Sequence, residues 1–529
     1  MSNIQILARA RRAWLVAVCL CLSLSAASAQ KRATYTNPVI AGDFPDPSVI
    51  RVGDDYWTTA TSGEWAPIFL VMHSRDLVHW EAKGAVLPNR PSWAANSFWA
   101  PELQQFGNRF YVYYTARMKQ GPLCVAVASA AAPQGPYTDH GTLVCQEIGS
   151  IDAVATADEN GDVYLIWKED GNSRNQPTPL WAQKLSADGT RLVGSRRELF
   201  RNNPTTWEGG VVEGAFVVRR GEWFYLFYSG NACCGRRCDY ALGVARARKL
   251  LGPWEKNPAN PILAANNVWQ CPGHGSIVTN KQGTDYLLYH AYRKSDEAFH
   301  IGREALLDEV KWNANGWPSI NDGHGPSATA VRPPASGIVV SQDSFYDEFD
   351  ANAIGASWQW PQWNVPSIAV ETERGGRLSL SASDKKAKDP LLAALVTQRA
   401  PGGDYVATAA VNLAEMARGS SAGLSAYGDQ ENALGVAVGG GEIRVWRMVS
   451  KGRRNVATAK TTAQRVTLRM TSHDGARYRF AYSVDGKAWT PLGDEVDGAH
   501  LGNVRIALNV GGVPGAVGKF EWLRIEPAP

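Results

Sequence analysis

The stretch "GEWFYLFY", residues 221–228, is a turn containing glycine followed by an aromatic-rich run typical of a β-strand. Four other stretches have the same character: "GDDYW" from Gly53, "GNRFYVYY" from Gly107, "GDVYLIW" from Gly161 and "GTDYLLYH" from Gly283. The successive glycines are 54, 54, 60 and 62 residues apart. A period of this size, built from short strands, predicts a β-propeller with one blade per repeat.

Further strands recur within these repeats. The run "LCVAVASAAAPQGPY" at 123–137 matches "YALGVARARKLLGPW" at 240–254, and "FLVMHSRDLVHW" at 69–80 occupies the same place in the first repeat. No long segment with a helical period of 3.6 interrupts this order. We therefore predict five blades, with an irregular β-sandwich as the alternative.

The composition changes after the fifth repeat. Residues 321–337, "NDGHGPSATAVRPPASG", are rich in Gly, Pro, Ser and Ala, as linkers are. From residue 465, "RVTLRMTSHDGARYRFAYSVDGKAWTPLG" alternates apolar and polar residues around two Asp-Gly pairs, which are hairpin-turn signals. We predict an all-β chain with three parts: a five-bladed β-propeller over 30–325, a linker over 326–340 and a β-sandwich over 341–529.

The first 29 residues are organised like a secretory signal peptide. Three arginines precede an apolar run over 14–25, and Ala27-Ser28-Ala29 follows as a small-x-small cleavage signal. A membrane anchor is the alternative, but the run is shorter than the about 20 residues that a spanning helix needs. We predict cleavage before Gln30 and a periplasmic or extracellular protein.

Charge and cysteine content limit the partners. The 529 residues carry a formal net charge of +4, and three of those charges leave with the signal-peptide arginines. This predicts no nucleic-acid partner, and no membrane partner after signal removal. An even number of remaining cysteines favours disulfides over a zinc site, since no second C-x-x-C or paired histidine accompanies "NACCGRRC". The sequence does not reveal their pairing or the oligomeric state; the six are Cys124, Cys145, Cys233, Cys234, Cys238 and Cys271.

One polar residue recurs just ahead of each repeated turn: Asp46, Glu102, Asp152, Glu213 and His274. The innermost strand of every propeller blade lines the central axis, so these side chains are expected to meet there. Asp46 stands between two prolines, which restrict the backbone on both sides. Asp152 and Glu213 interrupt apolar runs, where a lone carboxylate is costly to bury. Clustered carboxylates have pKa values that are pushed apart, so one can act as a base and another as an acid, as glycoside hydrolases require.

Three short motifs in the propeller region resemble those of a known enzyme family. "FPDPS" at 44–48, "GSIDA" at 149–153 and "VVEGAF" at 211–216, in this order on five blades, resemble glycoside hydrolase family 43. The resemblance covers about residues 35–325. The C-terminal part is similar to the concanavalin A-like β-sandwich of β-xylosidases in that family.

The resemblance implies a role for each carboxylate. Asp46 would activate water as the general base, and Glu213 would protonate the leaving oxygen as the general acid. Asp152 would orient Glu213 and raise its pKa by like-charge repulsion. Family members invert the anomeric centre, which requires room for a water between base and acid, with the carboxyl groups about 6.5–9.5 Å apart.

Other residues are candidates for sugar binding. Trp99 in "FWAPEL" is predicted to pack on a sugar face, and Arg293 in "YHAYR" resembles an arginine that hydrogen-bonds sugar hydroxyls in related enzymes. Trp65 in "GEWAP" and Trp207 in "TTWEGG" are candidate pocket walls. The segment "SWQWPQWN" at 357–364 suits either a carbohydrate contact or an interface with the propeller.

His274 resembles the fifth-blade histidine of the family, which in several members holds a water or a calcium ion. A buried structural histidine is the alternative, and Glu102 is more often structural than functional. The sequence implies no required cofactor, and calcium near His274 is the one metal that the resemblance suggests.

We therefore expect an exported inverting glycosidase that releases terminal β-D-xylose or α-L-arabinofuranose from xylan, arabinoxylan or their oligosaccharides. A glycosidase acting on galactose or arabinan and a sugar-binding propeller without catalysis are alternatives. Related five-bladed fructosidases carry an Asn-Asp-Pro-type motif, whereas this chain has Pro45-Asp46-Pro47. The sequence does not separate xylose from arabinose, or exo from endo action.

Overall fold

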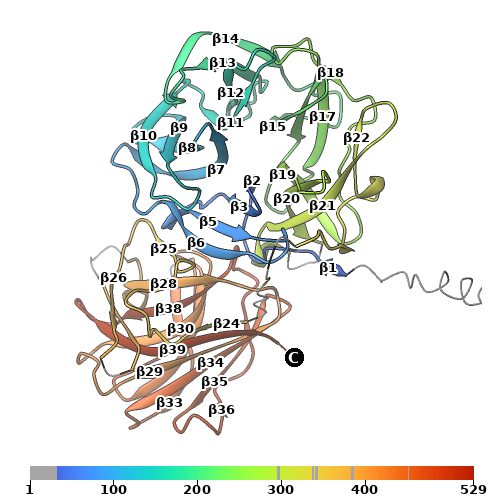
Figure 1. The fold of residues 1–529 in the computed structure, drawn as a ribbon. Helices are drawn as coiled ribbons and strands as arrows, with labels where there is room; N and C mark the ends of the chain where they lie inside the picture. The colour runs from blue at the N-terminus through green and yellow to red at the C-terminus, as the bar shows by residue number, and fades with distance from the viewer. Residues whose placement is uncertain are drawn as a thin grey trace, which may run out of the picture.

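The computed structural model of the chain describes residues 33–294, 298–335, 337, 339, 344–373, 375–382, 387–450 and 452–528. The predicted signal peptide over 1–29 lies outside the described residues, as do parts of the predicted linker. Figure 1 shows two bodies: a ring of sheets coloured blue to yellow, and a pair of packed sheets coloured orange to red. Over the described part of the chain, no helix is long and apolar enough to cross a membrane.

Five four-stranded antiparallel sheets, counted over the described residues, form the ring. Blade one contains β2 (Ser48–Val52), β3 (Asp55–Thr59), β5 (Ile68–Ser74) and β6 (Glu81–Leu87). Blade two contains β7 (Ala94–Phe106), β8 (Arg109–Met118), β9 (Leu123–Ala130) and β10 (Thr138–Val144). Blade three contains β11 (Ser150–Ala157), β12 (Val163–Glu169), β13 (Leu180–Leu185) and β14 (Leu192–Phe200). Blade four contains β15 (Val212–Arg220), β16 (Trp223–Gly230), β17 (Ala241–Ala247) and β18 (Glu255–Lys256). Blade five contains β19 (Trp269–Thr279), β20 (Asp285–Arg293), β21 (Glu304–Trp312) and β22 (Pro318–Ile320). The predicted five-bladed propeller is therefore confirmed.

The repeated glycine turns join the first and second strands of every blade. All five turn glycines have a positive φ, from +56° at Gly107 to +89° at Gly161. This left-handed conformation is open to glycine without steric cost. The repeat found in the sequence is therefore the inner hairpin of each blade.

The segment that precedes blade one is docked on blade five. β1 (Thr34–Thr36) pairs with β23 (Thr329–Val331), which follows the last blade. Asn37 exchanges hydrogen bonds with the backbone of Leu307 on β21, donating to its carbonyl at 3.1 Å and accepting from its N–H at 3.0 Å. This docking closes the ring and holds the segment carrying Asp46 beside blade five.

The C-terminal body is a β-sandwich of two antiparallel sheets. One sheet contains β24 (Phe345–Asp347), β26 (Ser367–Glu371), β27 (Arg377–Ser381), β29 (Tyr405–Asn412), β34 (Arg465–His473), β35 (Arg477–Ser483), β36 (Thr490–Pro491), β37 (Val496–Asp497) and β39 (Val517–Pro527). The other contains β28 (Ala394–Arg399), β30 (Ser421–Tyr427), β31 (Ala433–Gly439), β32 (Glu442–Val449), β33 (Gly452–Lys460) and β38 (Arg505–Gly511). Short helices are η1 (Gly171–Arg174), α2 (Ala298–Ile301), η2 (Asn321–Gly323) and η3 (Pro390–Leu392).

The two bodies meet through the aromatic segment at 357–364. β25 (Trp360–Pro361) of this segment pairs with β4 (Trp65–Ala66) of blade one. Gln359 donates through Nε2 to the carbonyl of Pro67 at 2.8 Å, and Gln362 donates to Glu64 Oε2 at 2.8 Å. Of its two predicted roles, the structure therefore assigns this segment a contact with the propeller.

The six cysteines form three disulfides, as predicted. The pairs are Cys124–Cys145, Cys233–Cys234 and Cys238–Cys271. The third pair ties the "NACCGRRC" loop to β19, three residues before His274. The loop is thus attached to the strand that carries the fifth-blade histidine.

Candidate active site

Asp46 lies on the segment that enters blade one, two residues before β2, with a φ of +55°. Its backbone N–H donates to Nδ1 of His290 on β20 at 3.0 Å. Thr61 donates through Oγ1 to Asp46 Oδ2 at 2.6 Å, and Arg303 donates through Nη1 to Oδ1 at 3.2 Å. Because backbone and both carboxylate oxygens have partners, the orientation of the carboxylate is fixed.

The charges around Asp46 keep it ionised. Burial alone would raise the pKa of Asp46, but Arg303 and His274 outweigh that effect and hold the pKa of this carboxyl well below its ordinary value. Positive neighbours favour the charged form of a carboxyl group. Asp46 is therefore a carboxylate at neutral pH, which is the form that a general base must have.

Glu213 lies on β15, the innermost strand of blade four, and two donors hold it. Lys168 on β12 donates through Nζ to Glu213 Oε2 at 2.6 Å. The Tyr240 hydroxyl donates to Oε1 at 2.9 Å. Burial would raise the pKa of Glu213, but the Lys168 ammonium, together with His274 and the Tyr240 hydroxyl, outweighs burial and lowers the pKa below the ordinary value.

Asp152 lies on β11, the innermost strand of blade three, and has the opposite electrostatic environment. Burial is the largest influence, and with the repulsion from Glu213 it raises the pKa of Asp152 to about 7 against the attraction of His274. Asp152 Oδ2 accepts a hydrogen bond from the backbone N–H of Gly214 at 3.2 Å, which joins it to the strand carrying Glu213.

The raised pKa therefore falls on Asp152 and not on Glu213, where the family resemblance places it. Lys168 is the reason, because its ammonium stabilises the Glu213 carboxylate directly. Asp152 therefore keeps its proton to a higher pH than Glu213 does.

His274 lies on β19 between two of these carboxylates. Its Nδ1 is 3.4 Å from Asp46 Oδ1 and 3.9 Å from Asp152 Oδ2. Burial would lower the pKa of His274, but the surrounding carboxylates raise it. The backbone N–H of His274 donates to Ser229 Oγ at 2.8 Å, which fixes the strand that carries the imidazole.

Gly214 leaves the space that this imidazole occupies. A Cβ at Gly214 would lie 2.7 Å from Cγ of His274, and its φ is +60°. Both the contact and the left-handed backbone require glycine at this position. The glycine after Glu213 in "VVEGAF" thus allows blades four and five to approach at the axis.

The left-handed backbone recurs on the innermost strands. Asp152 and His274 have φ values of +55° and +37°, and Ala100 on β7 has +43°. The register of each strand pair shifts near these residues, as at a β-bulge, which redirects a side chain. Their backbone N–H groups donate hydrogen bonds to hydroxyl oxygens on the preceding blade: Asp152 to Thr115, His274 to Ser229 and Ala100 to Thr61.

Glu102 is also close to this centre. Burial raises the pKa of Glu102 to about 7, partly offset by hydrogen bonds involving Ser48 and Gln104 and by the charge of His274. Gln104 donates to its Oε1 at 3.0 Å. The structure therefore brings together Asp46, Asp152, Glu213 and His274, with Glu102 within electrostatic reach of His274.

The predicted sugar-binding residues lie in different places. Trp99 is half-buried on β7, one residue before Ala100, whose N–H bonds the Thr61 hydroxyl that also contacts Asp46. Arg293 pairs with Glu304 at 3.3 Å, and its guanidinium lies 4.8 Å from the centre of a tryptophan ring on β19. Arg303, not Arg293, is the arginine that contacts a catalytic candidate.

Two predicted wall residues are engaged in packing. Trp65 contacts Tyr427 of the sandwich edge-on at 5.8 Å, and the Arg505 guanidinium lies 4.3 Å from its ring centre. Trp207 packs on blade four, where its ring stands 2.4 Å from a Cβ placed at Gly243. Trp65 therefore lies at the boundary between the propeller and the sandwich, and Trp207 packs within blade four.

Sequence reasoning missed five residues of the site: Thr61, Lys168, Tyr240, His290 and Arg303. The signal used for Asp152 and Glu213 was available for Lys168 and His290, since "YLIWKED" and "YLLYHAY" each place a charged or titratable side chain in an apolar run. Thr61, Tyr240 and Arg303 had no such signal, because their neighbours in the sequence are unremarkable.

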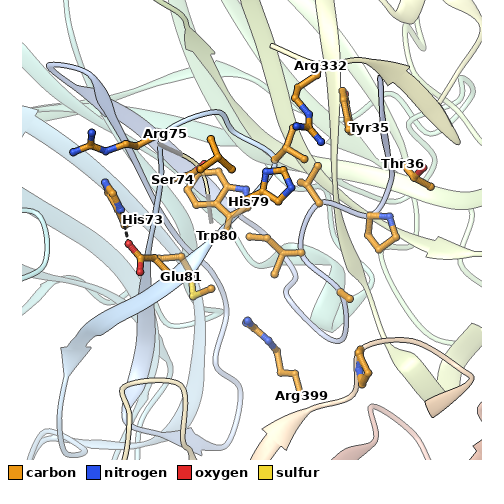
Figure 2. Close-up of a pocket in the computed structure, with 18 of the residues that line it drawn as sticks. Tyr35, Thr36, His73, Ser74, Arg75, His79, Trp80, Glu81, Arg332 and Arg399 are labelled. Atoms are coloured by element: carbon orange, nitrogen blue, oxygen red, sulfur yellow. Dashed lines mark hydrogen bonds and ion pairs between the residues drawn. The ribbon is translucent and has the colours of Figure 1, made fainter. Parts of the chain in front are cut away.

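A separate cavity of about 770 Å³ lies where blade one, the N-terminal segment and the sandwich meet (Figure 2). Its labelled lining includes His73, His79 and Arg399. Both histidines are already paired: His73 with Asp55 at 2.8 Å and Glu81 at 3.0 Å, and His79 with Asp76 at 2.7 Å. None of the three carboxylates at the propeller centre lines this cavity.

The family resemblance suggested one metal at the propeller centre, a calcium ion near His274. Among the residues that the structure describes, no group of three or more His, Cys, Asp or Glu side chains is arranged to hold a metal ion. The His274 imidazole faces carboxylates that raise its pKa, so it is suited to carry a positive charge itself. Calcium near His274 stays a prediction.

Two family descriptions match the chain. Residues 35–318 match "Glycosyl hydrolases family 43", and residues 346–517 match "Beta xylosidase C-terminal Concanavalin A-like domain". A non-reducing-end α-L-arabinofuranosidase of Bacteroides ovatus is 28% identical over 415 residues, covering 75% of this chain and 74% of that protein. A xylosidase/arabinosidase of Humicola insolens is 27% identical over 366 residues, covering 65% of each chain. A crystal structure of a family 43 protein of Bacillus licheniformis superposes with a TM-score of 0.78 at 25% identity, covering 94% of this chain and all of the other.

Proposed function

Because the chain belongs to glycosyl hydrolase family 43, we propose that it is an exported, inverting glycosidase that removes terminal pentose units from xylan, arabinoxylan or their oligosaccharides. One observation supports this proposal most strongly. Three buried carboxylates from separate blades converge around His274: positive neighbours hold Asp46 and Glu213 below their ordinary pKa values, whereas burial raises the pKa of Asp152 to about 7. A site that only bound sugar would have little use for three buried acids.

The proposed reaction assigns one task to each carboxylate. Asp46, held ionised by Arg303, takes a proton from a water molecule on one face of the sugar. Glu213 gives a proton to the glycosidic oxygen on the other face, so the leaving alcohol departs neutral. The water oxygen bonds to the anomeric carbon as the glycosidic bond breaks, which inverts the configuration. Asp152, bonded to the backbone of the strand that carries Glu213, orients the acid. After the products leave, Asp46 releases its proton to water and Glu213 takes one from water.

Pentose substrates are favoured by the relatives. The two curated relatives are described as acting on arabinofuranosides, or on both xylosides and arabinosides. Trp99, one residue from the Ala100 turn beside Thr61, is the proposed stacking surface for the sugar ring. Xylose and arabinofuranose are both kept in the proposal, and exo action is favoured because the Bacteroides relative is named for the non-reducing end.

Export rests on two features. Residues 1–29 have the organisation of a signal peptide, and the remaining cysteines all lie in disulfides. Disulfides persist in the periplasm and outside the cell, and they are rare in the cytosol.

The test is release of 4-nitrophenol from the β-D-xylopyranoside and the α-L-arabinofuranoside, together with xylobiose hydrolysis followed by ¹H NMR. We expect turnover of at least one pentoside, and the α-anomer of xylose as the first product from xylobiose if xylose is preferred. The Glu213→Gln protein should bind sugar but lose turnover of xylobiose. Turnover of galactosides alone, or retained activity in Glu213→Gln, would contradict the proposal.

A further inference from the structure

Lys168 is a charged residue inside an otherwise apolar strand. Its side chain is 1% exposed, and the three residues before it on β12, Leu165, Ile166 and Trp167, are fully buried. Nζ donates to Glu213 Oε2 at 2.6 Å on the neighbouring blade and to Asp170 Oδ1 at 3.2 Å on its own blade. Burying an ammonium group costs free energy because the charge loses its hydration, so a buried lysine at this position requires an explanation.

A purely structural ion pair is available for comparison in the same blade. Lys184 on β13 pairs with Asp162 Oδ2 at 2.6 Å, but both side chains are more than 40% exposed. Exposed pairs of that kind contribute little. Lys168 differs because it is buried and because its partner is the proposed general acid.

The two oxygens of Glu213 have different donors. Tyr240 holds Oε1 at 2.9 Å and Lys168 holds Oε2 at 2.6 Å, so the carboxylate plane is set by two blades at once. Tyr240 is a neutral donor, whereas Lys168 brings a full charge. Lys168 therefore affects both where the acid lies and whether it keeps its proton.

We propose that Lys168 is the positioning residue of the acid, fixing the orientation of Glu213 and setting the pH above which Glu213 no longer supplies a proton. The inference rests on the proposed glycosidase function. It assigns the alkaline limit of activity to the Lys168–Glu213 contact, and the acidic limit to Asp46, which has a different set of charged neighbours.

Several charged groups face Glu213, and each lies on a different element. Asp152 on β11 repels it, while Lys168 on β12 and His274 on β19 attract it. Tyr240 donates a hydrogen bond, and Asp170 reaches it only through Lys168. Removing the Lys168 charge leaves the repulsion from Asp152, so the pKa of Glu213 should rise. Removing the Asp170 charge takes away one of the carboxylates that share Lys168 with Glu213, so the pKa of Glu213 should fall.

The first experiment measures kcat/KM against pH for Lys168→Met and Lys168→Arg. An opposite charge within hydrogen-bond distance shifts a carboxyl pKa by about 1–3 units, so Lys168→Met should move the alkaline limb up by about one unit or more. The acidic limb should stay in place, because Arg303 and His274 control Asp46. Lys168→Arg should restore most of the alkaline limb. Lys184→Met, the matched control on the same blade, should leave both limbs unchanged.

A second variant keeps the proposal testable if Lys168→Met does not fold. Asp170→Asn should move the alkaline limb the other way, to lower pH. Opposite displacements in the two variants would support the proposal. Unmoved alkaline limbs in folded Lys168→Met or Asp170→Asn, with activity lowered equally at every pH, would overturn it and leave Lys168 a packing residue.

A titration without substrate separates this proposal from the proposed function. Infrared difference spectra of the protonated carboxyl band, recorded from about pH 2.5 to 9, follow Glu213 in the free protein, with Glu213→Gln to identify its band. Lys168→Met should raise the midpoint of that band whether or not a pentoside is hydrolysed. An unchanged midpoint would refute the role of Lys168, whereas a shifted midpoint in a protein that hydrolyses no pentoside would refute only the substrate assignment.

Discussion

The centre of the propeller and the core of the sandwich are both buried but hold opposite kinds of side chain. At the centre, Asp46, Asp152, Glu213 and Lys168 are each less than 10% exposed. The main sandwich core consists of aliphatic and aromatic side chains, such as Leu508 and Val436, at 0% exposure. Burial of apolar area stabilises the second region, whereas burial of charge is unfavourable in the first and is offset only by paired charges and hydrogen bonds.

Because of this difference, we expect substitutions in the two regions to affect different properties of the protein. Changes at the propeller centre are expected to alter turnover more than folding, because charge is placed there for chemistry. Changes in the sandwich core are expected to alter folding and leave turnover per folded molecule unaffected.

The largest expected effect is on turnover from Asp46→Asn. Loss of a general base typically lowers the rate by about 10²–10⁴-fold. The loss should be similar for 4-nitrophenyl pentosides and for xylobiose, because water activation is needed in both cases. Steady-state kinetics check this, and a loss smaller than about 10-fold would remove Asp46 from the role of base.

In the sandwich, Leu508→Ala should lower the free energy of unfolding by about 2–5 kcal/mol, through lost apolar contacts and a residual cavity. Values of kcat and KM, corrected for the folded fraction, should not change. Urea unfolding and steady-state kinetics are the measurements. Val456→Ala on β33, at a site that is 41% exposed, is the control and should stay within about 0.5 kcal/mol of the parent.

Gly214→Ala joins the two regions of the comparison, since it changes backbone strain and site geometry together. The new Cβ would meet the His274 ring, and displacement of a site group by about 1 Å can lower the rate by about 10²-fold. Gly221→Ala is the matched control, with a φ of +58° and open space around the added Cβ. Gly221→Ala should destabilise the protein through similar backbone strain without changing kcat/KM. Equal losses of kcat/KM in both variants would refute the prediction that contact between the new Cβ and His274 lowers the rate.

The smallest expected effect is on the pH dependence of stability at Glu102. The pKa of Glu102 is raised to about 7 in the folded protein, so the folded state binds more protons than the unfolded state between pH 4 and 7. Stability from this group is therefore greatest below about pH 4 and declines as the pH rises towards 7. Glu102→Gln should flatten that decline in urea unfolding measured at several pH values, and an unchanged slope would contradict the assignment.

The architecture of the propeller could be predicted from the amino-acid sequence. The five glycine turns and the aromatic runs after them predicted five blades, because the same local hairpin recurs at a regular spacing. The polar residue in each blade predicted which side chains meet at the axis, because an innermost strand has its place set by the repeat. Asp46, Asp152, Glu213 and His274 were found in this way.

The protonation states of these side chains could not be predicted from the sequence, because they depend on contacts between distant segments. The raised pKa belongs to Asp152 rather than Glu213 because Lys168, 45 residues away from Glu213 in the chain, reaches Oε2 from the neighbouring blade. Arg303 reaches Asp46 across 257 residues, and no local pattern marks that contact. The aromatic segment at 357–364 was equally undecided until its pairing with β4 was seen. Periodicity is a local property that a sequence displays, whereas protonation depends on charges brought together by the closed ring.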